Sequence, residues 1–226
     1  MRIDKFISNQ TSLSRKDVRK VLKDKRVIVN DQFVKKSDFK FDETKDLVYL
    51  DNELLEYRKF TYILLNKPAG CVSANFDKEE TTVFDLIDDE TNNLACVGRL
   101  DKDTEGLLLI TNDGKLNHDL LSPKNHVDKK YYVEIEHALD EEDIKLLTSG
   151  TITLDNSVLK PAIVEVISEN SIYLTIYEGK YHQVKRMLEA CNNNVTYLKR
   201  VSMGKLKLTD DLDIGEYKYI NIDEII

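Results

Sequence analysis

Apolar residues in this chain fall into short runs bounded by turn residues, and this pattern limits the folds open to it. The clearest run is Leu-Leu-Leu-Ile at residues 107–110, which is typical of a buried strand. A second run, residues 61–65, ends at an Asn-Lys-Pro-Ala-Gly segment that stops a strand. The further predicted strands are residues 130–136, 162–167 and 171–177, and the predicted helices are residues 82–88, 140–149 and 183–191. This mixture predicts an α+β protein.

Basic residues are concentrated at the N-terminal end, although the net charge of the whole chain is −8. Residues 1–40 hold 12 Lys and Arg against 5 Asp and Glu, a net charge of +7. The remaining 186 residues carry 21 basic and 36 acidic side chains, a net charge of −15. This asymmetry indicates that one end of the chain binds an anion such as nucleic acid. A solvated basic face without a partner is the alternative.

The basic segment has the pattern of a small folded module. Ser14 and Asp17 resemble a capping box, and Val18, Val21 and Leu22 then form one apolar helix face. Short strands are predicted at residues 27–29, 32–34 and 47–50. We interpret the polar and charged residues 51–60 as a linker to the larger second unit.

Composition excludes several classes of protein. The three cysteines, Cys71, Cys96 and Cys191, are far apart, so neither a disulfide framework nor a cysteine zinc site is predicted. No apolar run approaches the roughly 18–20 residues of a membrane span, and the N-terminus lacks the apolar core of a signal peptide. The 4 histidines show no metal-ligand spacing, and the 8 glycines form no phosphate loop. We expect a cytoplasmic protein without a metal, a nucleotide cofactor or a membrane partner.

Residues 98–106, Gly-Arg-Leu-Asp-Lys-Asp-Thr-Glu-Gly, place a carboxylate on a short loop just before a strand. Asp101 lies beside Arg99 and is our candidate for the residue that carries out the chemistry. The loop also begins like a calcium-binding loop, but Asn112 occupies the position of the bidentate Glu that such a loop needs. A calcium site is therefore excluded.

A second basic cluster occupies residues 179–207, with Tyr181 and Tyr197 interleaved and Glu189 as the single acid. Basic residues with aromatics suit a surface that follows an RNA backbone and stacks on bases. A surface helix with ordinary solvated lysines is the alternative.

Three sequence blocks in a fixed order carry a family resemblance. They are Leu-Asn-Lys-Pro-Ala-Gly at residues 65–70, the loop and strand at residues 98–108, and Glu-Gly-Lys-Tyr-His-Gln-Val-Lys-Arg-Met at residues 178–187, with Lys-Lys-Tyr at residues 129–131 between the last two. Together they resemble the RsuA-type bacterial ribosomal RNA pseudouridine synthases. The resemblance implies an S4-like RNA-binding domain at residues 1–58. It also implies a catalytic domain at residues 59–226, with a mixed, mainly antiparallel sheet flanked by helices.

The resemblance implies that a uridine is flipped out of its RNA and isomerised to pseudouridine without a cofactor or metal. Asp101 takes the place of the catalytic aspartate, which either adds to the sugar carbon C1′ or removes a sugar proton. Lys185 takes the place of the basic residue that pairs with that aspartate. Tyr131 matches the tyrosine that lies against the target base, and Arg99 would hold or replace the flipped uridine. Alternation along a strand puts Tyr131 and Tyr132 on opposite faces, with Tyr132 expected in the core.

The resemblance also implies RNA contacts and a partner. The residues expected to bind RNA are Arg2, Lys5, Arg15, Lys16, Arg19, Lys20, Lys180, His182, Gln183, Arg186 and Arg200. The expected partner of the monomeric enzyme is ribosomal RNA or an assembling small ribosomal subunit. The block at residues 181–186 and a C-terminus without a long basic tail favour 16S over 23S rRNA.

Two other classes of protein account for only part of the sequence pattern. A non-catalytic S4-type assembly factor would explain the N-terminal charge but not the set of Asp101, Tyr131 and Lys185. A glycosidase acting on free sugars needs a second carboxylate. Asp103 lies too close to Asp101 in sequence to face it across a sugar ring.

Overall fold

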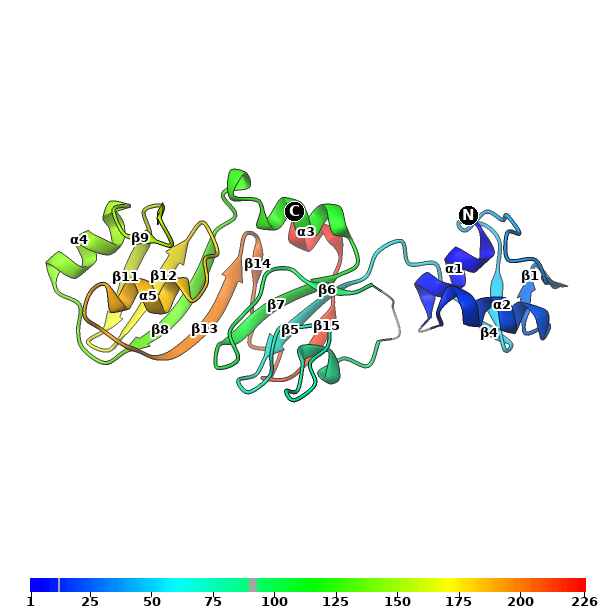
Figure 1. Ribbon diagram of the computed structural model, residues 1–226, viewed down its shortest axis with the longest axis horizontal. Coiled ribbons are helices and arrows are strands. Elements are labelled where there is room, and N and C mark those ends of the chain that lie inside the picture. The colour runs from blue at the N-terminus through cyan, green and yellow to red at the C-terminus, as the bar shows by residue number, and fades with distance from the viewer. Residues whose placement is uncertain (12, 90–92) are drawn as a thin grey trace. The chain divides into compact units, whose positions relative to one another are not determined.

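The computed structural model describes residues 1–11, 13–89 and 93–226, which form two compact units (Figure 1). The N-terminal unit comprises Met1–Thr61 with the described residues of Asp88–Leu94, and the C-terminal unit comprises Tyr62–Ile87 and Ala95–Ile226. Within the described ranges, no helix combines the length and the hydropathy of a transmembrane span. The domain boundary after residue 58 stays a prediction.

The N-terminal unit packs two helices against a four-stranded antiparallel sheet. Its elements are α1 (Ile3–Gln10), α2 (Arg15–Lys23), β1 (Val27–Val29), β2 (Gln32–Phe33), β3 (Val48–Leu50) and β4 (Glu53–Leu54), with the sheet in the order β2-β1-β3-β4. As predicted, the Ser14 hydroxyl caps α2 by accepting a hydrogen bond from the Asp17 backbone N–H. The apolar face of α2 is buried against Ile3, Phe6 and Ile7 of α1. Helix α1 was not predicted from the sequence.

The interpretation of residues 51–60 as a linker was wrong for its first half. Leu50 and Tyr49 pair with Glu53 and Leu54, so that β3 and β4 form a hairpin. The turn residues Asp51 and Asn52 have φ values of +53° and +69°, the left-handed region that Asp and Asn tolerate in such turns. The polar composition concealed this hairpin because its second strand is only two residues long and exposed.

A mixed, mainly antiparallel sheet of nine strands forms the C-terminal unit, which confirms the predicted fold class. Its strands are β5 (Tyr62–Lys67), β6 (Ala95–Cys96), β7 (Glu105–Thr111), β8 (Lys129–Ile135), β11 (Ile163–Ser168), β12 (Ser171–Ile176), β13 (Val195–Met203), β14 (Leu206–Lys207) and β15 (Tyr217–Tyr219). The main order is β11-β12-β8-β13-β7-β5-β15, while β14 pairs with β13 and β6 pairs with β7. Strands β13 and β7 are parallel. A separate hairpin joins β9 (Thr153–Leu154) and β10 (Ser157–Val158).

The helices of the C-terminal unit match the predictions in part. They are the 3-10 turns η1 (Val83–Leu86) and η2 (Pro123–Asn125) and the α-helices α3 (Gly114–Leu121), α4 (Glu141–Ser149), α5 (Gln183–Glu189) and α6 (Ile222–Ile225). The helices predicted at residues 140–149 and 183–191 are α4 and α5, whereas residues 82–88 contain only a 3-10 turn. Asp113-Gly114, a sequence signal for a turn after the strand at residues 107–111, instead begins α3, because the Asp113 carboxylate accepts hydrogen bonds from the backbone N–H groups of Lys115 and Leu116.

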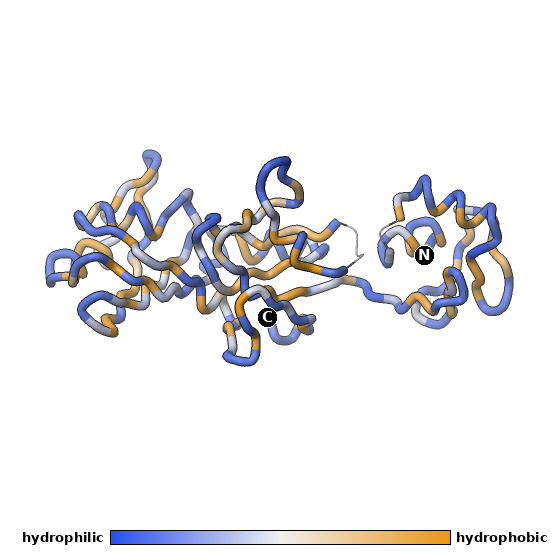
Figure 2. The backbone as a smooth tube through the Cα atoms, turned by 90° about the horizontal axis from the view of Figure 1, so that it is seen from below, coloured by the Kyte–Doolittle hydropathy of each residue, from blue (hydrophilic) through white to orange (hydrophobic). Residues whose placement is uncertain are grey.

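The core of the C-terminal unit lies against its central strands. Residues 107–110 of β7 are fully buried, and Leu107 and Leu109 pack with residues of α3 and α6. Figure 2 shows hydrophobic residues along the central strands and hydrophilic residues in the outer loops. The sheet with its buried central strands thus provides a rigid support for the loop that precedes β7.

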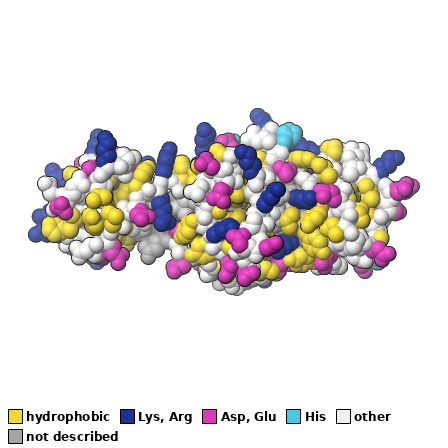
Figure 3. Space-filling view, turned by 180° about the vertical axis from the view of Figure 1, so that it is seen from behind, with side chains coloured by type: hydrophobic (Ala, Val, Ile, Leu, Met, Phe, Trp, Pro, Cys, Tyr) yellow, Lys and Arg dark blue, Asp and Glu magenta, His cyan; other side chains and the backbone are white. Residues whose placement is uncertain are grey.

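On the face seen in Figure 3, basic and acidic side chains lie among one another rather than in large patches of one sign.

Candidate active site

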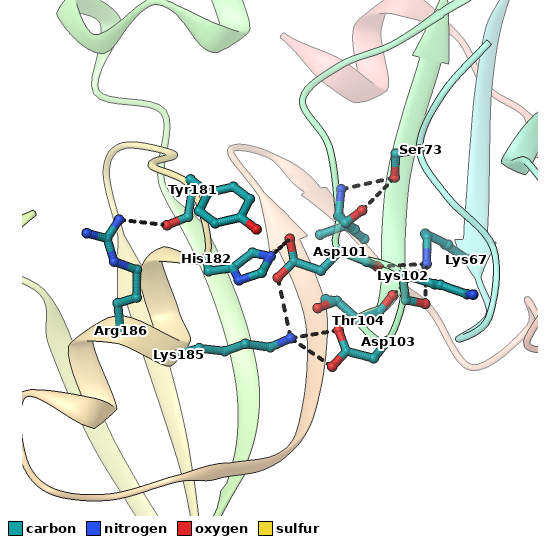
Figure 4. A network of polar contacts seen from close by, with 11 residues as sticks. Lys67, Ser73, Asp101, Lys102, Asp103, Thr104, Tyr181, His182, Lys185 and Arg186 are labelled. Atoms are coloured by element: carbon teal, nitrogen blue, oxygen red, sulfur yellow. Dashed lines mark hydrogen bonds and ion pairs between the residues drawn. The ribbon is translucent and has the colours of Figure 1, made fainter. Parts of the chain in front are cut away.

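The loop before β7 is fixed through its backbone by a buried lysine at the end of β5. The Lys67 ammonium donates hydrogen bonds to the main-chain carbonyls of Asp101 at 3.1 Å, Lys102 at 3.4 Å and Thr104 at 2.8 Å (Figure 4). It also donates to the carbonyl of Pro68 at 2.9 Å. Burial lowers the pKa of the Lys67 ammonium. Because the four carbonyls belong to the main chain, these contacts do not depend on the side chains of the loop.

A serine adds a second anchor to the same loop. The Ser73 hydroxyl donates to the Leu100 carbonyl at 2.9 Å and accepts from the Leu100 N–H at 3.1 Å. The Gly70 N–H donates to the Lys102 carbonyl at 2.7 Å. The block at residues 65–70, predicted only to end a strand and to carry the family resemblance, therefore also holds the candidate catalytic loop. The sequence signal was a lysine at the end of an otherwise apolar strand, which the sequence analysis left without a role.

Gly106 lets β13 approach the end of this loop. Its φ is +98°, and a Cβ added there would lie 2.3 Å from the carbonyl oxygen of Arg200. Only glycine fits this position, because any side chain would meet the backbone of the neighbouring strand.

Asp101 projects from the loop toward the turn before α5 and toward α5 itself. Its carboxylate Oδ1 lies 3.5 Å from Nε2 of His182, and its Oδ2 lies 3.5 Å from Nζ of Lys185 (Figure 4). The Asp101 side chain is 29% exposed. The structure thus brings together Asp101 and Lys185, as the sequence analysis expected, and adds His182, for which only an RNA contact was expected.

Asp103 is a member of the site that the sequence analysis missed. Lys185 Nζ donates to both carboxylate oxygens of Asp103, at 2.6 and 2.8 Å, which is closer than its approach to Asp101. This hydrogen bond holds the pKa of Asp103 below its usual range. The two acids two residues apart were the available signal, but they were considered only for a calcium-binding loop and for a glycosidase.

The turn that carries His182 is closed by several hydrogen bonds. The Gln183 side chain accepts from the Lys180 N–H at 2.9 Å, and the Gln183 N–H donates to the Lys180 carbonyl at 3.2 Å. Arg186 forms a two-pronged ion pair with Asp155, both contacts at 2.9 Å, and also donates to the Tyr181 carbonyl. Gln183 is buried. The geometry therefore gives Gln183 and Arg186 internal partners where RNA contacts were expected.

Tyr131 lies on the buried side of β8. It pairs with Arg200 of β13, which in turn pairs with Gly106 of β7. Because neighbouring strands are spaced by roughly 5 Å, Tyr131 lies about 10 Å across the sheet from the end of the candidate catalytic loop. Tyr132 points to the opposite, more exposed face and donates to Glu134, so its expected place in the core was wrong.

Arg200 differs from its expected role as a surface RNA contact. The side chain is only 2% exposed, and Nε donates to the Leu107 carbonyl at 2.7 Å. Lys129 is also buried, and burial together with the positive charge of Arg200 lowers the pKa of its ammonium to about 8. Arg99, by contrast, is exposed on the loop two residues before Asp101.

The expected RNA contacts of the N-terminal unit lie mostly at its surface. Five of them are exposed, namely Lys5 of α1 and Arg15, Lys16, Arg19 and Lys20 of α2. Arg2 is exposed as well, but its guanidinium is bound to the buried carboxylate of Asp4 at 2.8 and 3.0 Å. The helix α2 therefore presents the densest group of basic side chains in this unit.

Comparison with known proteins gives the site its chemical context. Residues 61–190 match the sequence model of the RNA pseudouridylate synthase family. The ribosomal small subunit pseudouridine synthase A of Yersinia pestis is 39% identical over the whole chain and 97% of its own length. The enzyme of the same name from Escherichia coli K12 is 37% identical, with 98% of its length covered. The chain is an RsuA-type pseudouridine synthase. The expectation from the sequence blocks is thereby confirmed.

Further relatives of this pseudouridine synthase extend over its full length. The uncharacterized RNA pseudouridine synthase YtzG of Bacillus subtilis is 43% identical over the whole chain and 97% of its own length. A crystal structure of a pseudouridylate synthase covers the whole chain and 98% of that protein, with 35% identity and a TM-score of 0.70. Pseudouridine synthases are isomerases that modify RNA, so the chemistry to be assigned is the rearrangement of a uridine.

Proposed function

We propose that this synthase converts one uridine of 16S ribosomal RNA to pseudouridine, with Asp101 acting on the sugar of that nucleotide. The observation that supports it most is the Asp101 carboxylate on a loop fixed through its backbone, with His182 and Lys185 each 3.5 Å away. The names of the full-length relatives from Yersinia pestis and Escherichia coli support the small-subunit target.

The reaction is a rearrangement that needs no other reactant. The bond from N1 of uracil to C1′ breaks, the base turns, and C5 forms the new bond to C1′ while its proton passes to N1 or to water. Asp101 either adds to C1′ and is later displaced, as carboxylates do in retaining glycosidases, or removes a sugar proton and returns it to the sugar when the new bond has formed. In both routes the charge of Lys185 keeps the Asp101 carboxylate oriented toward the sugar.

Two further residues support this chemistry in our proposal. Tyr131 lies against the target base and limits its movement while the base turns. Arg99, exposed at the start of the loop, occupies the space that the flipped uridine leaves in the RNA. Flipping costs a few kcal/mol, and less in an unpaired segment, so we expect the target uridine to lie in a loop or in an incompletely assembled region.

The N-terminal unit supplies sequence-independent affinity. The exposed basic side chains of α2, Arg15, Lys16, Arg19 and Lys20, contact RNA phosphates in the manner of an S4-like domain. Phosphate contacts fix the position of a protein on RNA without reading its sequence. The enzyme acts as a monomer in the cytoplasm, on ribosomal RNA or on an assembling small subunit.

Mapping pseudouridines in the ribosomal RNA of cells that lack this protein tests the proposal. We expect one pseudouridine to disappear from 16S rRNA and to return with the wild-type protein but not with Asp101→Asn. Loss of a 23S site with 16S rRNA unchanged would contradict the target. Restoration by Asp101→Asn would contradict the role of Asp101.

A further inference from the structure

Two aromatic rings stack on each other at the edge of the site. The ring centroids of Tyr181 and His182 lie 3.8 Å apart, with an angle of 16° between the ring planes. Tyr181 is 70% exposed, although large aromatic side chains gain most from burial. His182 has a φ of +49°, a left-handed conformation that costs energy for a residue other than glycine and persists only where the surroundings impose it. The pair is thus an exposed aromatic surface with an imposed geometry.

The surroundings of the pair keep it in place before any ligand binds. The Tyr181 carbonyl accepts a hydrogen bond from Arg186, which Asp155 holds by two contacts. The reciprocal hydrogen bonds between Lys180 and Gln183 close the turn on either side of the two rings. A ligand that stacks on Tyr181 therefore loses little binding free energy to the ordering of this side chain.

The pair also adjoins the reaction centre directly. His182 turns its Nε2 toward Asp101 at 3.5 Å, while Tyr181 covers one face of the His182 ring (Figure 4). The Tyr181 ring is thus stacked on the ring whose Nε2 faces Asp101. Flat rings on such a surface suit a nucleobase, because every base has a face that stacks on an aromatic side chain.

The second basic cluster of the sequence supports a polyanionic ligand here. Lys180 directly precedes the two rings, whereas the ammonium of Lys185 is already paired with Asp103. An aromatic surface beside a basic side chain is an arrangement by which proteins bind single-stranded RNA. Positive charge here does not favour an apolar protein partner, because such a partner offers no oppositely charged group.

We propose that Tyr181 and His182 form a stacking platform for an unpaired base of the substrate RNA that neighbours the target uridine. This inference rests on the proposed function, since it requires RNA at Asp101. It assigns to the enzyme a second base-binding position beside the one for the flipped uridine. Binding there holds the RNA strand at a fixed distance from Asp101.

The first experiment measures turnover. Wild type, Tyr181→Phe and Tyr181→Ala are assayed by tritium release from 16S rRNA transcript that contains 5-tritiated uridine, both free and after partial assembly with small-subunit proteins. Since stacking contributes about 1–3 kcal/mol per base, we expect Tyr181→Ala to lower kcat/KM at least fivefold and Tyr181→Phe to stay within twofold. An active wild type with an equally active Tyr181→Ala would overturn the platform. A wild type without activity would instead count against the proposed function.

The second experiment observes the stacking itself. The chain contains no tryptophan, so Tyr181→Trp provides a single fluorescent reporter. Tyr219→Trp on the edge strand β15, whose side chain is 49% exposed, is the matched control. We expect a uridine hexanucleotide to quench the reporter at position 181, and an abasic ribose-phosphate chain of the same length to leave it unchanged. Equal quenching by both chains, or at both positions, would overturn base stacking at Tyr181.

Discussion

The ammonium of Lys185 lies closer to Asp103 than to Asp101. It donates to both Asp103 oxygens at 2.6 and 2.8 Å, while its distance to Asp101 is 3.5 Å. One cation therefore serves two carboxylates that are two residues apart on the same loop. We interpret Asp103 as the residue that positions Lys185, so that the Asp101 carboxylate is attracted by the cation without a tight hydrogen bond to it.

Asp103→Asn is expected to slow the enzyme without weakening RNA binding. The substitution keeps the shape of the side chain but removes the charge that holds Lys185. A charge-assisted hydrogen bond at an exposed carboxylate contributes about 1 kcal/mol, so we expect kcat to fall about fivefold with KM within twofold. Single-turnover tritium release measures the change. A wild-type kcat would contradict the positioning role.

A double-mutant cycle separates this role from a general loss of charge. If Asp103 acts through Lys185, the effects of Asp103→Asn and Lys185→Met are not additive, and the double variant is about as slow as Lys185→Met alone. Additive losses would show that Asp103 acts on the substrate independently of Lys185.

Lys67→Met is expected to destabilise the C-terminal unit. The substitution leaves the carbonyls of Asp101 and Thr104 without the ammonium donor in a buried environment, and each such group costs about 1–3 kcal/mol. We expect a loss of about 3 kcal/mol in the free energy of unfolding, measured by urea denaturation of the whole chain.

Lys102→Met is the matched control for Lys67→Met. Lys102 belongs to the same loop but extends to Glu80 at 2.6 Å in an ion pair at the surface. Exposed ion pairs contribute at most about 1 kcal/mol, so the control is expected to lose no more than that. Equal losses in the two variants would contradict the assignment of Lys67 as the anchor of the loop.

Much of the fold could be predicted because its strands are apolar runs with few polar interruptions. Strands β5, β7, β8 and β12 all lie within a residue or two of their predicted ranges. Strand β13 escaped prediction, although it is the longest, because Lys199 and Arg200 interrupt its apolar pattern and suggested a basic surface. Helix α3 was missed since an Asp-Gly pair can begin a helix as well as close a turn.

The candidate site could be predicted only for those residues that lie in a recognisable sequence block. Asp101 and Lys185 could be proposed from their sequence blocks, and the structure places them within ion-pair distance. The roles of Lys67 and Asp103 depend on contacts across 34 and 82 positions of the chain. The lysine at a strand end and the two nearby acids mark these residues in the sequence but not the groups that they contact, so their roles could only come from the structure.

Gly106→Ala tests the close approach of β13 to β7. The added methyl group would lie 2.3 Å from a backbone oxygen at a φ of +98°, so the two strands would have to separate. We expect a loss of more than about 3 kcal/mol in stability. Gly114→Ala, at the start of α3 with no atom within 4 Å of the added group, is expected to be neutral or to stabilise by up to about 1 kcal/mol. The same loss at both positions would contradict the steric account.

The buried Lys129 predicts that stability rises with pH in the alkaline range. Its pKa is lowered to about 8 in the folded protein from the usual lysine value of 10.5, so between these values the unfolded chain binds more protons than the folded one. The free energy of unfolding should therefore rise with pH, by about 2 kcal/mol between roughly pH 7 and 9.5.

Lys129→Met isolates this contribution, because the titrations of all other groups are common to both proteins. The stability of the wild type minus that of the variant should increase over this pH interval in urea denaturation. A difference that stays constant with pH would contradict the depressed pKa of Lys129.

Asp101→Asn tests the central claim most directly. The loop is held through main-chain carbonyls rather than through the Asp101 carboxylate, so the variant should fold with wild-type stability and bind RNA within about threefold of wild type. The measurement is tritium release from 16S transcript with 5-tritiated uridine, free and partly assembled. We predict release no faster than without enzyme. Release at the wild-type rate would contradict the assignment of Asp101 as the residue that acts on the nucleotide sugar.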